Sequence, residues 1–181
     1  MQDKPNDLLL LAGQVIAIFV QIVMGIAAAV LVIVVPLFFL FRDEVTAEIA
    51  AESAAAAEAF PVMPTAGLLL IALAVVALVF LFFQRLRAII ATVGEGDPFA
   101  PENADRLNLM AWLLLGVQIL MIPASALGLL VAKWADEVEN ADITIDAGLD
   151  LTGILMIIIL FILARVFKHG AAMRADLEGT V

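Results

Sequence analysis

The sequence contains no cysteine and only one histidine, His169. The absence of cysteine excludes disulfides, thiolate metal sites and cysteine nucleophiles. His169 has no companion at a metal-ligand or haem-ligand spacing, and no serine–histidine pairing, phosphate-binding loop or dinucleotide fingerprint is present. We therefore expect a protein that is not an enzyme, with no catalytic residues, no metal and no cofactor.

Charged residues are also scarce. They make up 15% of the 181 residues, against about 25% in an ordinary soluble domain, while 65% of the chain is hydrophobic. The net charge is −10. Direct nucleic-acid binding is not expected, because phosphate recognition needs a basic surface.

The hydrophobic residues are gathered in four runs without charge: Leu8–Phe41, Ala59–Gln84, Leu107–Ala132 and Leu151–Ala164. A membrane-spanning helix needs about 20 such residues. We predict an all-α, polytopic membrane protein, a single domain over 1–181 built as a four-transmembrane-helix bundle. The expected spans are 12–36, 66–86, 109–132 and 148–167. The fourth run has only 14 residues, so a re-entrant or interfacial helix is the alternative there.

Lysine and arginine are unevenly divided among the connections. Seven lie in the N-terminal tail, the 85–108 connection and the C-terminal segment, and two, Arg42 and Lys133, lie in 42–64 and 133–150. By the positive-inside rule, both termini and 85–108 are cytoplasmic. The expected location is the cell inner (cytoplasmic) membrane, with the lipid bilayer as first partner and acidic outer loops at 42–64 and 133–150.

Periodicity predicts helical extensions beyond the membrane. Leu86, Ile89, Ile90 and Val93 form one stripe, which predicts that the second span continues to Gly94–Gly96. A second stripe contains Val166, Gly170, Met173 and Leu177. We expect these cytoplasmic extensions to pack on each other; the alternative is that each lies on the bilayer surface. On the other side, 45–60 is expected to continue the first helix outward, with a kink at Pro36, and 142–146 to be extended.

Polar residues inside the spans are few and uncharged. Gln14 with Gln21, and Gln118 with Ser125, are each seven residues apart and predict an intramembrane polar stripe between the first and third helices. Such a stripe serves either interhelical hydrogen bonding or a solute path. No ionisable residue lies near the middle of a span, which argues against a proton relay or ion pump.

The most motif-like segment is Gly94–Phe99, where glycines permit a reversal and Pro98 fixes the backbone before Phe99. Gly96-Asp97-Pro98-Phe99 and Asn103 to Leu107 are similar to a "G-x-P-F…N…R-L" signature. The tail from Val166 to Val181 is similar to a "v-F-x-x-G…D-x-x-x-T-V" ending. In these motifs the chain resembles the bacterial domain-of-unknown-function family 2975, over nearly its whole length in span order, without the acidic outer loops. The resemblance implies a small four-helix inner-membrane protein without an assigned activity. It also suggests a helix-turn-helix regulator as partner, because many members are encoded beside one.

We therefore expect a non-enzymatic membrane protein whose cytoplasmic face binds a protein partner or a second copy. The alternatives are an accessory or structural subunit of a larger membrane complex, and a small-solute channel or transporter lined by the polar stripe. The predicted partner-binding residues are Pro98, Phe99, Arg106, Phe167, Met173 and Leu177.

Overall fold

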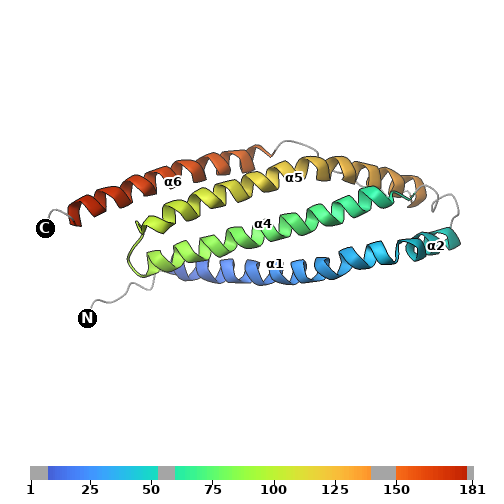
Figure 1. Cartoon of the computed structure of the whole chain (residues 1–181), viewed down its shortest axis with the longest axis horizontal. Helices are drawn as coiled ribbons and strands as arrows, with labels where there is room; N and C mark the ends of the chain where they lie inside the picture. Colours follow the sequence, from blue (N-terminus) through green and yellow to red (C-terminus); the bar gives the residue numbers. More distant parts are fainter. Residues whose placement is uncertain (1–7, 53–59, 140–149, 179–181) are drawn as a thin grey trace. The chain divides into compact units, whose positions relative to one another are not determined.

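The computed structural model describes residues 8–52, 60–139 and 150–178. In these residues it is all-helical (Figure 1), with the order α1 (Leu8–Leu40), α2 (Arg42–Glu52), α4 (Val62–Gly94), α5 (Pro101–Glu139) and α6 (Leu151–Glu178). α1, α4, α5 and α6 are long and apolar enough to cross a membrane. The predicted fold class is thereby confirmed, and the chain is compatible with a multi-pass membrane protein. The 142–146 segment lies outside the described residues.

Two helix boundaries differ from expectation. α1 does not run on into the next segment: it ends at Leu40, four residues beyond Pro36, and α2 begins at Arg42. α5 continues to Glu139, seven residues past the expected end of the third span. The break between α1 and α2 falls at Phe41, the last residue of the apolar run. The extension of α5 lies in a charged segment, where helix formers such as Ala and Glu continue the helix after the apolar run has ended.

The chain divides into two compact units. Unit 1 contains Met1–Gly25, Leu78–Val117 and Asp150–Val181, and unit 2 contains Ile26–Ala77 and Gln118–Leu149. In unit 2, Gly67 of α4 meets α5 so closely that an added Cβ would lie 2.8 Å from Leu127 Cδ1. Near the charged ends, the rings of Phe60 and Trp134 meet edge to face with centroids 5.0 Å apart. Small residues and aromatic pairs therefore bring the helices of this unit together.

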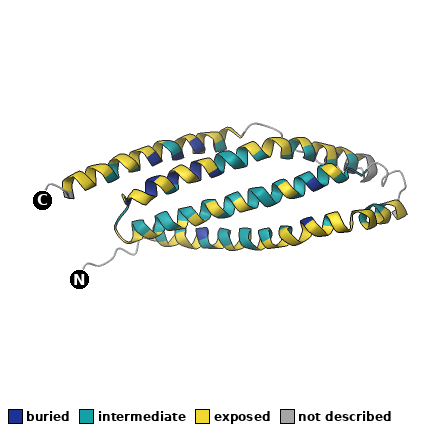
Figure 2. Ribbon diagram, viewed as in Figure 1, coloured by how far each residue is buried: buried dark blue, intermediate teal, exposed yellow. Residues whose placement is uncertain are grey.

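The core of unit 1 lies between the first half of α5 and α6. It contains the buried residues Leu107, Met110, Ala111, Leu160 and Ala164. Side chains from the end of α4 close it, namely Phe82, Leu86 and Ile89. Many apolar side chains of α1, α5 and α6 are exposed, whereas those of α4 are mostly of intermediate exposure (Figure 2). Water would disfavour such a surface and hydrocarbon would not, which fits the membrane assignment.

α1 packs along α4 in unit 1 with opposite direction. A Cβ added at Gly13 would lie 3.5 Å from Ile90 Cδ1, and one at Gly25 would lie 3.7 Å from the Phe80 ring. The first turns of α1 therefore lie beside the last turns of α4. This pairing brings the apolar start of α1 to the level of residues that follow Arg85 and Arg87.

Candidate functional site at the turn between α4 and α5

The turn between α4 and α5 is fixed by its own backbone. The amide of Gly96 donates to Val93 O at 3.1 Å, and that of Asp97 donates to Thr92 O at 2.9 Å. These two bonds make a Schellman motif, whose left-handed position falls on Gly96 at φ +85°. α5 then begins at Pro101, where a proline costs no hydrogen bond. The glycines and prolines thus reverse the chain in six residues, as the sequence predicts.

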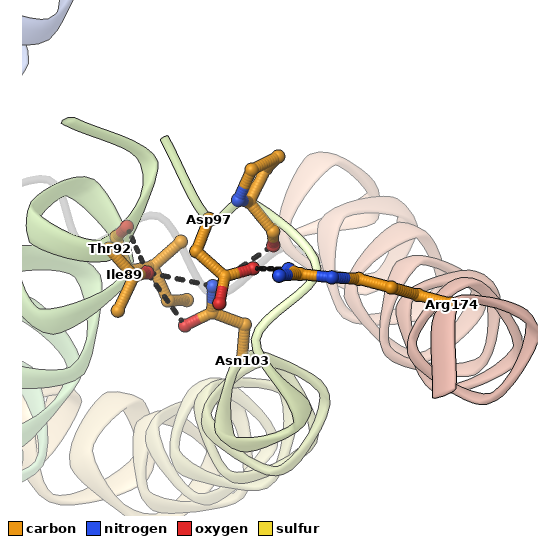
Figure 3. A network of polar contacts seen from close by, with 6 residues as sticks. Ile89, Thr92, Asp97, Asn103 and Arg174 are labelled. Carbon is orange, nitrogen blue, oxygen red and sulfur yellow. Dashed lines mark hydrogen bonds and ion pairs between the residues drawn. The ribbon is translucent and has the colours of Figure 1, made fainter. Parts of the chain in front are cut away.

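Asn103 is the centre of the site. It is fully buried, with no exposed surface, yet its side chain is polar. Its Nδ2 donates to Thr92 Oγ1 at 2.8 Å and to Pro98 O at 3.0 Å, while Thr92 Oγ1 donates to Ile89 O at 2.8 Å (Figure 3). A buried amide is tolerated only when its hydrogen-bonding capacity is used. Asn103 therefore ties the end of α4, the turn and the start of α5 into one structure.

Arg106 completes this network from one turn further along α5. Its Nη1 donates to Asn103 Oδ1 at 2.8 Å and to Ala88 O at 3.3 Å. The guanidinium therefore bridges α5 to α4 and orients the Asn103 amide. Of the six predicted partner-binding residues, Arg106 is thus also a structural one.

Phe99 lies against α6. A Cβ added at Gly170 would lie only 2.6 Å from Phe99 Cδ1, and the Phe99 and Phe167 ring centroids are 5.5 Å apart. Glycine at 170 leaves a notch that the Phe99 ring fills. These contacts hold the turn against α6.

An ion pair joins the same two elements. Arg174 Nη1 of α6 donates to Asp97 Oδ1 of the turn, and Figure 3 shows the arginine reaching across from α6. Both side chains are about half exposed. We define the turn cluster as Thr92, Asp97, Phe99, Asn103, Arg106, Phe167, Gly170 and Arg174.

The predicted stripe on the end of α6 does not form the packing face. The residues that pack are Ile157, Leu160, Ala164 and Phe167, followed by Gly170 against Phe99. Val166, Met173 and Leu177 are 55%, 63% and 71% exposed. The end of α6 packs on the turn through Gly170 and not through Val166, Met173 or Leu177, because this packing uses a glycine notch and an ion pair in place of large apolar side chains. Of the predicted partner-binding set, Pro98, Phe99, Arg106 and Phe167 gather at the turn, and Met173 and Leu177 lie on the exposed side.

Five members of the turn cluster were not among the predicted site residues: Thr92, Asp97, Asn103, Gly170 and Arg174. Asn103 and Gly170 belong to the quoted motifs, but nothing in their spacing indicates that one is a buried hub and the other a notch. Thr92 carries no signal, since a threonine near a helix end is common. Arg174 was counted only as a basic residue of the tail.

The predicted polar stripe is divided between the two units. In unit 1, Gln21 Oε1 accepts a hydrogen bond from Arg87 Nη1 of α4 at 2.9 Å, and Gln14 is exposed. In unit 2, Ser125 Oγ donates to Met121 O of its own helix at 2.9 Å, and Gln118 is partly buried. Gln21 and Ser125 thus have other partners, and the stripe between α1 and α5 stays a prediction.

Within the described residues, no group of three His, Asp or Glu side chains is placed to hold a metal ion. His169 Nδ1 lies 3.1 Å from Arg165 O, one turn earlier in α6. In the tautomer with Nδ1 protonated, this is a local donor to the helix backbone.

All of these features belong to a small helical protein with membrane-length helices. A family model described as a protein of unknown function (DUF2975) matches residues 42–181. The chain belongs to this family, as the motifs predicted. The match covers α2 to α6 and leaves out α1, so it is narrower than the resemblance, but it includes both acidic segments that the resemblance left out. No curated protein and no solved structure matches the chain.

Proposed function

We propose that this chain is a non-enzymatic integral membrane protein of the inner membrane that binds a protein partner through its cytoplasmic face. Both termini are then cytoplasmic, and the face consists of 85–107 and 165–181. The charge asymmetry of the connections supports this orientation. The resemblance suggests a small helix-turn-helix regulator as the partner, with the membrane protein itself making no nucleic-acid contact.

The proposal is supported by the end of α6, which has one face packed on the turn and an opposite face that is apolar and exposed. One side is held to the turn through Gly170 and Arg174. The other exposes Val166, Met173 and Leu177 at i, i+7 and i+11. A helix whose far side is held in this way is not free to lie flat in the bilayer surface, and an apolar helix stripe in water is a common docking element for another protein.

Site-specific photocrosslinking in intact cells tests the proposal. A photoreactive residue at Met173 is expected to give a specific crosslink to one partner, whereas one at the neighbouring exposed Ala172 is not, because it lies on a different helix face. Met173→Glu should abolish co-purification of that partner, and Ala172→Glu should preserve it. Both variants should insert normally. Equal crosslinking at 172 and 173, or capture unchanged by Met173→Glu, would contradict the proposal.

An accessory subunit of a larger membrane complex is the second candidate, and the start of α1 favours it. Gly13 lies level with Ile90, five residues beyond Arg85, and Leu8 lies a further five residues out. Leu8 and Leu9 are 79% and 82% exposed. Apolar side chains beyond a basic boundary are stabilised when another subunit covers them. Native mass spectrometry from mild detergent should then find a stable complex, and Leu8→Ser/Leu9→Ser should dissociate it. A lone monomer would remove this candidate.

A further inference from the structure

A cavity of about 340 Å³ lies beside the turn cluster, on the outside of unit 1. It is lined by Arg85 of α4 and by Glu102, Asp105, Arg106 and Leu109 of α5. The four α5 residues occupy i, i+3, i+4 and i+7, so they form one face of the helix. Ligand pockets are about 300–1,000 Å³, which makes this one large enough for a small polar group.

Of the four charged residues around the cavity, only Arg106 takes part in the hydrogen bonds of the turn cluster. Arg85 Nε is buried and has no hydrogen-bond partner. Within the described residues, neither Glu102 nor Asp105 makes an ion pair, and both bonds of Arg106 use Nη1 alone. Two guanidinium groups and two carboxylates thus surround the cavity without pairing with one another.

The order of the side chains matches a membrane boundary. Arg85 ends the uncharged run of α4, and Arg106 precedes the uncharged run of α5, within which Leu109 lies. From Glu102 to Leu109, α5 rises by about 10 Å. Along this distance the lining changes from carboxylate, through carboxylate and guanidinium, to an apolar side chain that is 39% exposed.

We propose that this cavity binds a zwitterionic phosphate–ammonium group, as carried by the headgroup of phosphatidylethanolamine. Arg85 and Arg106 hold the phosphate, Glu102 and Asp105 hold the ammonium, and Leu109 contacts the start of the acyl chains. The headgroup has the same order, with ammonium outermost, then phosphate, then hydrocarbon. The proposal rests on the membrane location of the helices and not on partner binding.

The lining charge selects the headgroup. Two guanidinium groups and two carboxylates sum to zero, so an anionic phosphatidylglycerol would face two uncompensated carboxylates. The trimethylated ammonium of phosphatidylcholine cannot donate hydrogen bonds to Glu102 or Asp105. Phosphatidylethanolamine satisfies both halves of the site.

Native mass spectrometry with phosphatidylethanolamine, phosphatidylglycerol and phosphatidylcholine of matched acyl chains tests this. The wild type should retain phosphatidylethanolamine about tenfold better than the other two, the factor expected from one charge-assisted hydrogen bond. Arg85→Gln should lower the retention of all three lipids, because the phosphate it holds is common to them. Arg87→Gln should leave retention unchanged, because Arg87 lies on the same helix but contacts Gln21. Equal retention of the three lipids by the wild type, or equal effects of the two arginine variants, would overturn the proposal.

A second variant keeps the proposal testable if Arg85→Gln does not fold. Glu102 and Asp105 are exposed, so Glu102→Gln/Asp105→Asn should fold normally and shift the preference toward phosphatidylglycerol. An unchanged preference in this double variant would overturn the assignment of the ammonium. Soluble glycerophosphoethanolamine should compete only weakly, because it has no acyl chains for Leu109; competition as strong as that of the lipid would overturn a membrane lipid as the ligand.

Discussion

At the scale of single residues, Gly170 and Asn103 determine the turn cluster. Gly170 supplies space and Asn103 supplies hydrogen bonds, and neither is a large apolar residue. In a chain that is 65% hydrophobic, the specific contacts of this site therefore come from its least hydrophobic members. Packing by apolar area alone would not choose between the faces of α6.

Gly170→Ala should destabilise the protein by about 1–3 kcal/mol, because the new Cβ overlaps the Phe99 ring. This loss outweighs the roughly 1 kcal/mol that alanine gains over glycine in a helix. Gly94→Ala is the control: nothing lies within 4 Å of its Cβ, so it should be neutral or stabilising. Unfolding in detergent measures both.

The double variant Gly170→Ala/Phe99→Ala identifies the cause of the loss. It should be less destabilised than the two single variants added together, because removing the ring also removes the overlap. Strict additivity would mean that Gly170 does not act through Phe99.

Asn103→Leu is expected to destabilise by about 1–3 kcal/mol for each buried polar group that loses its partner. Pro98 O loses the donor given by Asn103, and Arg106 Nη1 keeps only its 3.3 Å bond to Ala88 O. Asn108 lies on the same helix and is exposed, so Asn108→Leu should change stability little. If both substitutions shift the unfolding midpoint equally, the Asn103 network is not what holds the turn.

At the scale of elements, α6 carries out two tasks with two faces. Its packing face joins the core and the turn, and its opposite face exposes Val166 and Met173. The tie to the turn beyond Gly170 is a half-exposed ion pair, and such pairs contribute about 0–1 kcal/mol. Releasing the end of α6 beyond Gly170 from the turn therefore costs little free energy.

Arg174→Gln should speed backbone hydrogen exchange over 168–177 while leaving the global unfolding midpoint almost unchanged. The pair is exposed to salt, so high ionic strength should bring the wild-type exchange rate toward that of the variant. Lys168→Gln changes the same net charge on an exposed side chain and should have little effect. Salt-independent exchange in the wild type would contradict a role for the ion pair.

The elements are well predicted from the sequence, and the site only partly. Long runs without charge determine the helices, and Gly96 with Pro98 determines the turn. The notch at Gly170 and the hub at Asn103 depend on which side of α6 meets the turn. The visible apolar stripe indicated the wrong side, since a helix with apolar residues on most faces gives no unique packing direction.

At the scale of the whole molecule, the orientation in the membrane is the property to measure. The natural chain has no cysteine, so each introduced cysteine is the sole label. Glu48→Cys should react with an impermeant maleimide in intact cells, whereas Glu95→Cys and Ala172→Cys should react only after permeabilisation. The reverse pattern would invert the proposed topology, and partner binding and lipid binding would then move to the other side together.

The contacts between the turn and α6 also have a consequence for biosynthesis. Asp97 and Arg174 are 77 residues apart, and translation at about 5–20 residues per second separates their emergence by roughly 4–15 s. During that interval the first three long helices can insert, but the Phe99 ring has no notch to fill. Docking of α6 therefore covers one side of the ring, which stays 42% exposed in the folded chain, and the uncovered side distinguishes an unfinished chain from a finished one.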